Sequence, residues 1–86
     1  MNLKQLSHVV ALSETLSFSK AAERVHLSQS ALSKSIASLE DELNIQIFDR
    51  TTNAVSVTPT GQFVVDHAQN LLSEANAFLD SDDRLL

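Results

Sequence analysis

The stretch that decides the fold is residues 16–44, which read LSFSKAAERVHLSQSALSKSIASLEDELN. Ser17 and Ser28 each precede a run with helical periodicity, and serine is among the preferred N-cap residues. After Ser28 one apolar stripe recurs at helical spacing, formed by Leu32, Ile36, Leu39 and Leu43. Asn44 follows this stripe, where a helix often ends in a left-handed residue. The stretch therefore predicts a short helix, a turn and a longer helix over 28–43.

The flanking segments predict three more elements. Residues 2–14 carry apolar side chains at helical spacing, which indicates a first helix. Between residues 45 and 57 the apolar period changes to two, which predicts a small β-hairpin. Thr58 and Pro59 suit the N-cap and first position of a long helix, about 33 Å if it ends near residue 80. Together these elements form a mainly α winged helix-turn-helix, with three helices, a β-hairpin wing and a long C-terminal linker helix.

Length and composition limit the class of protein. The 86 residues suffice for one winged helix-turn-helix domain, residues 1–58, followed by a linker or dimerisation helix and tail, residues 59–86. The chain has no cysteine and one glycine, which excludes disulfides, thiolate metal sites and glycine-rich phosphate loops. Because it lacks a long apolar run and a signal sequence, we expect a soluble, cytoplasmic protein.

No residues suggest catalysis or metal binding. His8, His26 and His67 lie in different segments without a second histidine four residues away, so surface or capping roles are expected. A single glycine excludes the G-x-S-x-G motif, and no cysteine nucleophile is present. We therefore expect no enzymatic activity, no cofactor and no metal site.

Charge is distributed unevenly along the chain. The formal net charge of −5 argues against a nucleic-acid partner. Residues 1–39, however, hold four cations and two acids, a net charge of +2, whereas residues 40–86 have a net charge of −7. The first half can therefore face a polyanion although the whole chain is acidic.

The face of helix 28–43 opposite its apolar stripe has small, polar or cationic side chains, namely Gln29, Ser30, Ser33, Lys34 and Ala37. Glutamine can bond an adenine edge, serine can donate or accept, and lysine can reach phosphate or guanine. Ser28 and the free first-turn N–H groups would suit a phosphate. An ordinary solvent-exposed face is the alternative, but such faces usually carry acids, and none occurs here before Glu40. We interpret residues 40–42 as a solvent-exposed acidic run.

The hairpin tip, residues 50–53, is the expected wing. Such a tip can lie along the DNA backbone or in the minor groove. Arg50 is its only cation, and an equally weighted alternative pairs Arg50 with Asp49 or with the acidic end of the preceding helix.

Five motifs in this sequence resemble the N-terminal domain of LysR-type transcriptional regulators. They are SFSKAAER at 17–24, LSQSALSK at 27–34, LEDEL at 39–43, IFDRT at 47–51 and TPTG at 58–61. The resemblance covers residues 1–80 without a gap and implies a dimer that binds inverted repeats in double-stranded DNA, with helix 28–43 in the major groove. It also implies an effector-sensing domain, which this chain lacks. We therefore expect the chain to be an isolated DNA-binding fragment, with a naturally short protein as the alternative.

The resemblance also implies residue roles. Recognition-helix contacts fall on Gln29, Ser30, Ser33 and Lys34, and further DNA contacts fall on Ser28, Arg50, Thr51 and, in the wing, Asn53. Ser30 stands where the family commonly has proline, and the wing reads TNA over 52–54 where arginines are common. Because fewer cations release fewer counterions, we expect weak nonspecific affinity and a shallow salt dependence.

The apolar residues of the long helix recur in a seven-residue pattern, at Val64, Val65, Ala68, Leu71, Leu72, Ala75, Phe78 and Leu79. We expect one side of this stripe to cover the domain's own first helix, with help from Phe63, and the rest to bind the same helix of a second chain. A helix used entirely by its own domain is the alternative. A homodimer would present two recognition helices to two half-sites.

Two functions follow from these observations. The first is sequence-specific binding of double-stranded DNA by a homodimer. The second is a helical protein-interaction module that retains the fold, which the overall acidity and the sparse wing would permit.

Overall fold

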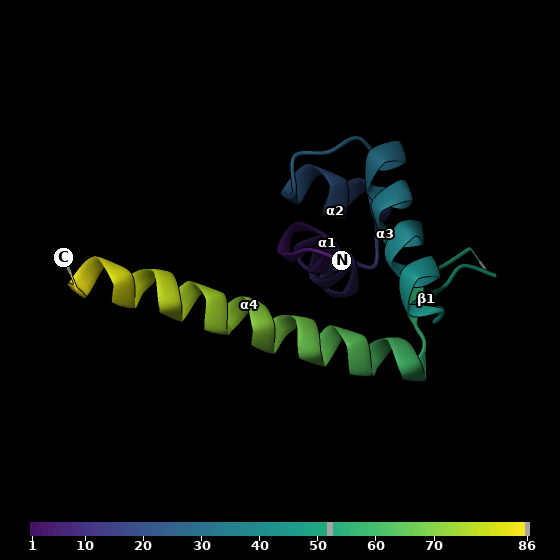
Figure 1. Ribbon diagram of the computed structural model, residues 1–86. Coiled ribbons are helices and arrows are strands. Elements are labelled where there is room, and N and C mark those ends of the chain that lie inside the picture. Colours follow the sequence, from purple (N-terminus) through teal and green to yellow (C-terminus); the bar gives the residue numbers. More distant parts are fainter. Residues whose placement is uncertain (52, 86) are drawn as a thin grey trace.

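The computed structural model describes residues 1–51 and 53–85, with side chains described as far as Asp80. Within these residues the elements are α1 (Leu3–Thr15), α2 (Phe18–Arg24), α3 (Gln29–Leu43), β1 (Phe48–Asp49), β2 (Ser56–Val57) and α4 (Pro59–Leu85). This order confirms the predicted winged helix-turn-helix with a long C-terminal helix (Figure 1). Residues 52 and 86, which belong to the predicted wing and tail, lie outside the described residues.

The helix boundaries follow the predicted capping residues. The side-chain oxygens of Ser17, Ser28 and Thr58 each accept a hydrogen bond from the backbone N–H three residues later, at 3.1, 3.0 and 2.8 Å. Asn44 ends α3 in the left-handed region, with φ 55° and ψ 42°. Because each cap satisfies otherwise unpaired helix groups, these four residues fix where α2, α3 and α4 begin and where α3 ends.

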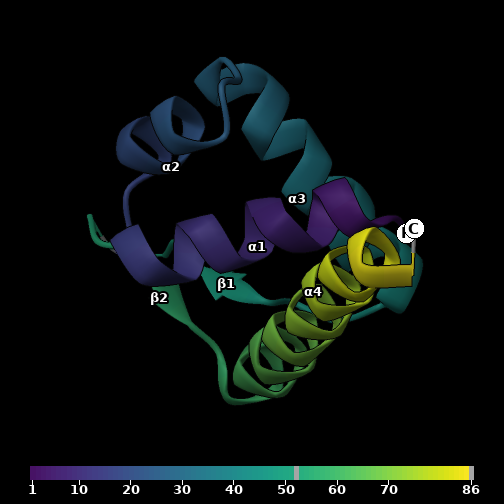
Figure 2. The ribbon, with the colours of Figure 1, turned by 90° about the vertical axis from the view of Figure 1, so that its left-hand side faces the viewer.

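Helix α1 lies at the centre of the fold and contacts α2, α3 and α4 (Figures 1 and 2). The largest fully buried side chains come from α1, α3, the residue before β1 and β1 itself. They are Val9, Leu12, Leu32, Ile36, Leu39, Ile47 and Phe48. Burial of each contributes about 1.5–3 kcal/mol before entropic costs. Because the predicted apolar stripe of α3 faces this core, the opposite face of α3 points outward.

The hairpin is shorter than predicted and begins later. Its strands pair antiparallel through only two positions, Phe48 with Val57 and Asp49 with Ser56. The period-two pattern predicted a strand from Ile45, but Ile47 is fully buried in the helical core. Its backbone N–H donates to the Glu40 carboxylate at 2.8 Å instead of to a strand. The alternation therefore reflects core packing as well as strand structure.

Helix α4 is longer than predicted and extends beyond the helices on which it packs (Figure 1). Its 27 residues span about 40 Å. The structure places Val64, Val65 and Ala68 in the domain's own core, which removes them from the surface predicted to bind a second chain. Phe63, expected to make the intradomain contact, is instead 64% exposed. The helical face available to a partner therefore differs from the predicted one.

Gly61 lies where the first turn of α4 crosses the segment before β1. A Cβ atom at this position would lie 2.1 Å from the carbonyl oxygen of Ile47 and 2.8 Å from its Cα. That oxygen also accepts the backbone N–H of Thr58 at 2.9 Å, so it is held in place. Only glycine allows this close crossing of two backbones.

Gly61→Ala should therefore lower the free energy of unfolding by about 1–3 kcal/mol, because the added methyl group overpacks this crossing. Urea denaturation followed by circular dichroism measures the loss. Thr60→Ala, a change at the exposed neighbouring position, is the control and should stay within about 0.5 kcal/mol of the parent. A Gly61→Ala variant as stable as the parent would show that the crossing is not tight.

Candidate DNA-binding surface

The first two turns of α3 present a polar surface whose side chains form no hydrogen bonds or ion pairs with the other described residues. Gln29, Ser30 and Lys34 are exposed and Ser33 is half-exposed, on the face opposite the buried stripe. Among the described residues, none of these four side chains has a hydrogen-bond or ion-pair partner. Their donors and acceptors are therefore free to bind a ligand.

The serines of α3 differ in what they already bind. Ser35 Oγ and His8 Nδ1 are hydrogen-bonded at 2.7 Å, which ties α3 to α1. Burial, and secondarily the charge of Lys4, lowers the pKa of His8, so its imidazole is neutral at neutral pH. Ser28 Oγ accepts the N–H of Ala31 and keeps its hydroxyl hydrogen available as a donor. Ser30 and Ser33 differ from both because their hydroxyl groups have no hydrogen-bond partner among the described residues.

Glu40 links the end of α3 to the base of the wing. Its Oε2 accepts the backbone N–H groups of Ile47 at 2.8 Å and Phe48 at 3.2 Å. The Glu40 side chain is only 16% exposed, so the prediction of a solvent-exposed acid is wrong at this position. The sequence offers no signal for this contact, because it depends on the path of the chain after Asn44. Glu40 satisfies two N–H groups that a longer strand would have paired.

Arg50 is held against α2 and α3 from two sides. Its Nη2 lies 3.6 Å from Glu40 Oε1, and its guanidinium carbon lies 4.7 Å from the centroid of the Phe18 ring. Of the two alternatives for Arg50, the structure shows the pairing with the acidic end of the preceding helix. The ion pair and the cation–π contact both fix the guanidinium group. Phe18, which the sequence did not single out, becomes part of this surface.

The described hairpin residues around Arg50 offer few groups to DNA. Asp49 Oδ1 accepts the backbone N–H of Thr51 at 2.9 Å and its hydroxyl at 2.7 Å. These bonds, the backbone bond first, lower the pKa of the Asp49 carboxyl and keep it ionised. Asn53 is exposed. The wing therefore places a negative charge beside Thr51, where a phosphate would be repelled.

A shallow hollow of about 310 Å³ joins three elements on this surface. It is lined by Phe18 from the start of α2, by Gln29, Ser30 and Ser33 from α3, and by Arg50 from the wing. Four of these residues were predicted to contact DNA, and the structure brings them together. Thr51 and Asn53, predicted for the same function, do not line the hollow.

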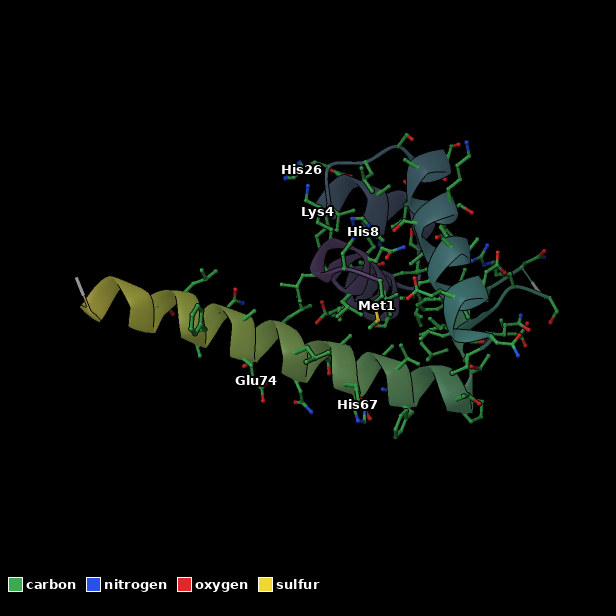
Figure 3. All side chains as sticks on the ribbon, in the orientation of Figure 1. Met1, Lys4, His8, His26, His67 and Glu74 are labelled. Atoms are coloured by element: carbon green, nitrogen blue, oxygen red, sulfur yellow. The ribbon has the colours of Figure 1, made fainter. Side chains whose placement is uncertain are left out.

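The cations of the helix-turn-helix differ in their partners. Arg24 pairs with Glu14 at 2.9 Å between two exposed side chains, whereas the described residues include no ion-pair partner for Lys20 or Lys34. Lys4 also has no ion-pair partner among the described residues, and it lines a separate hollow with Arg24 and His26. Lys4 and His26 are labelled in Figure 3. The positive charge beside the α3 surface is therefore modest but not neutralised.

The described part of the chain offers neither a metal-binding cluster nor a membrane-spanning helix. No group of three or more histidine, cysteine or acidic side chains could hold a metal ion there. None of the described helices combines the length and apolar character needed to cross a membrane. The polar face of α3, with the adjoining hollow, is thus the candidate functional site.

The sequence matches the bacterial regulatory helix-turn-helix proteins of the lysR family over residues 3–62. It is 44% identical over 84 residues to an SDS degradation transcriptional activation protein from a Pseudomonas species, covering 98% of this chain and 28% of that protein. It is 42% identical over 74 residues to the DNA-binding transcriptional dual regulator OxyR of Escherichia coli, covering 86% of this chain and 24% of that protein. The chain belongs to the lysR family of helix-turn-helix regulators.

Solved structures show the same relationship. The BenM DNA-binding domain in complex with benA site DNA has a TM-score of 0.95 and 38% identity, covering 99% of this chain and 96% of that one. A full-length OxyR variant from Pseudomonas aeruginosa has a TM-score of 0.94 and 39% identity, covering 98% of this chain and 28% of that one. The chain thus spans about a quarter of these longer relatives. These similarities favour the regulator hypothesis over the protein-interaction module.

Glu40→Ala should lower the free energy of unfolding by about 1–3 kcal/mol, because the backbone N–H groups of Ile47 and Phe48 lose their acceptor. Asp41→Ala removes the neighbouring acid, which is exposed, and should stay within about 0.5 kcal/mol of the parent. Both values come from urea denaturation. Equal effects of the two substitutions would show that Glu40 contributes only surface charge.

Proposed function

We propose that this domain binds double-stranded DNA sequence-specifically, as the DNA-binding part of a LysR-type transcriptional regulator, with α3 in the major groove. The observation that carries the proposal is the free polar face of α3, formed by Gln29, Ser30, Ser33 and Lys34. Small and polar side chains at the start of a helix suit close approach to base edges. The similarity to the BenM domain bound to DNA supports the proposal. We assign no enzymatic activity to the domain.

Each exposed group has a role in this proposal. Gln29 bonds an adenine edge through its amide, and Lys34 reaches a phosphate or a guanine. Ser28 donates its hydroxyl hydrogen to a phosphate at the N-terminus of α3, where the helix dipole also favours an anion. Arg50 can add a backbone contact only by loosening its contacts with Glu40 and Phe18. Specificity therefore rests more on α3 than on the wing.

The acidity of the chain is compatible with DNA binding because no acid lies in the first two turns of α3 and several acids face other parts of the molecule. Glu40 points to the base of the wing and bonds backbone N–H groups. Asp66, Glu74 and Asp80 lie on α4, which extends away from α3 (Figure 1). Such a regulator works on the chromosome, so we assign it to the cytoplasm. With few free cations, its affinity should depend less steeply on salt than that of a more basic domain.

Gln29→Ala should weaken binding to the preferred duplex by about 1–3 kcal/mol and leave binding to random DNA nearly unchanged. The preferred duplex is first selected from random sequences, and fluorescence anisotropy gives both affinities. Gln69→Ala, a change of the same residue type on the exposed part of α4, is the control. Equal losses on both duplexes would show that Gln29 does not read a base.

Lys34→Ala should weaken binding to all duplexes alike and reduce the slope of log K against log salt by about 1. Lys4→Ala, which removes another unpaired lysine from a different hollow, should leave the slope unchanged. An unchanged slope in Lys34→Ala would exclude a phosphate contact by Lys34.

We further propose that the domain acts as a homodimer through an exposed stripe of α4. This α4 stripe consists of side chains spaced at i, i+4, i+8, i+11 and i+15, namely Phe63, His67, Leu71, Glu74 and Phe78. Its three large apolar members are 64%, 44% and 72% exposed. Phe63 stacks on His67 with ring centroids 4.2 Å apart. His67 and Glu74 point away from α1 (Figure 3).

The α4 stripe revises the seam inferred from sequence. Leu71, Ala75, Phe78 and Leu79 remain exposed or half-exposed, whereas Leu72 packs partly against the domain's own core. A helix that presents exposed apolar side chains beyond its own domain gains stability by packing on an equivalent helix. A two-fold dimer would set two copies of α3 on the half-sites of an inverted repeat.

Leu71→Asp should convert the dimer to monomers, because it replaces the central apolar side chain of the α4 stripe with a second carboxylate beside Glu74. Sedimentation velocity measures the mass. Ser73→Asp adds the same charge at an exposed position outside the stripe and should leave the dimer intact. A parent chain that sediments as a monomer, or a Leu71→Asp variant of unchanged mass, would contradict the proposed interface.

A further inference from the structure

We propose that the hollow between α2, α3 and the wing receives the major-groove edge of a thymine, and that Phe18 is a specificity-determining residue. The inference rests on the proposed DNA binding, and it adds the identity of one base and of the residue that detects it.

The position of Phe18 suggests contact with DNA. Phe18 is the first residue of α2 and is half-buried, with part of its ring packed against the core. It also lines the hollow, together with Gln29, Ser30 and Ser33 from the face of α3 proposed to read bases. Of the five lining residues, Phe18 alone is apolar. A base bound against this part of α3 would therefore meet one apolar surface.

Among the four bases, only thymine carries a methyl group in the major groove, and phenylalanine is a suitable contact for it. The hollow of about 310 Å³ easily accommodates a methyl group, which is similar in size to a water of roughly 30 Å³. Burial of the methyl group against Phe18 favours thymine over any base that lacks it. The apolar wall thus provides a reason for base preference that charge alone would not.

The polar lining suits the rest of the thymine edge. Thymine places the acceptor O4 next to its methyl group, whereas cytosine places an amino donor there. The free hydroxyls of Ser30 and Ser33 can donate to O4, and the Arg50 guanidinium group offers donors only. A cytosine amino group could not bond the Arg50 donors, although serine or glutamine oxygens could accept from it. Because serine and glutamine side chains can bond either pyrimidine edge, the hollow discriminates between thymine and cytosine mainly through the methyl contact with Phe18.

The side of the hollow that Arg50 lines is already ordered before DNA binds. Its guanidinium group is fixed by Glu40 at 3.6 Å and by the Phe18 ring at 4.7 Å. A wall held by two contacts loses little conformational entropy when a base enters. Gln29 lies beside the same hollow, so a thymine there would neighbour the adenine that Gln29 is proposed to read.

Replacing thymine with deoxyuridine tests the inference, because it removes only the methyl group. Each thymine of the preferred duplex is replaced in turn, and fluorescence anisotropy gives the affinity of the full chain. We expect one position in each half-site to lose about fourfold in affinity, the effect of one buried methyl group. In Phe18→Ala the loss at that position should vanish. Phe63→Ala, a change of the exposed phenylalanine on α4, should retain it.

A crosslink tests the same contact in the unmodified chain, so it does not depend on the folding of Phe18→Ala. The sensitive thymine is replaced by 5-iodouracil, and the irradiated complex is digested and analysed by mass spectrometry. We expect a crosslink to the peptide that contains Phe18. A crosslink only to residues 51–57 of the wing would overturn the inference.

The outcomes separate the two proposals. If no duplex is preferred over scrambled DNA, the proposed function fails and this inference fails with it. If a duplex is preferred but deoxyuridine is tolerated at every position, only the inference is overturned. A deoxyuridine loss that persists unchanged in a folded Phe18→Ala variant also overturns it, because the methyl group is then read elsewhere.

Discussion

The packing of the α3 apolar stripe on α1 is the constraint on which the rest of the structure depends. Leu32, Ile36 and Leu39 are fully buried, so the rotation of α3 about its own axis is fixed. Successive residues of a helix are about 100° apart, and a shift of one residue would turn the polar side chains toward the core. Because this rotation is fixed, Gln29 and Lys34 point outward and form part of the polar surface of α3.

A second constraint sets the wing relative to α3. The Glu40 carboxylate accepts two backbone N–H groups and also faces Arg50, so one side chain joins a helix end, a strand start and the base of the wing. The same contacts bring Arg50 over Phe18 and close one side of the hollow. Glu40 would repel phosphate if it were exposed. Instead it holds Arg50 and the start of β1 in position beside α3.

Features with local causes could be predicted from the sequence. Ser17, Ser28, Asn44 and Thr58 mark helix boundaries because each bonds or adopts its cap within a few residues of chain. The outward face of α3 was predictable for a similar reason, since the buried stripe determines it. These signals, with the order of the elements, sufficed for the fold class and for most residues of the candidate surface.

Features that depend on tertiary contacts were not predictable. The period-two pattern that includes Ile47 suggested a strand, but the side chain packs into the core while its N–H bonds Glu40. The roles of Phe18 and Arg50 depend on the meeting of α2 with the wing, and no local pattern encodes it. On α4, the residues of two apolar faces alternate along the sequence. Only the position of α1 shows that Val65 is buried whereas Phe63 is exposed.

The most direct test of DNA binding through the polar face of α3 is an NMR titration of the 15N-labelled chain with its preferred duplex. We predict that the largest amide shift changes fall on residues 28–34. Changes concentrated on α4, with residues 28–34 unmoved, would contradict the binding of DNA by α3.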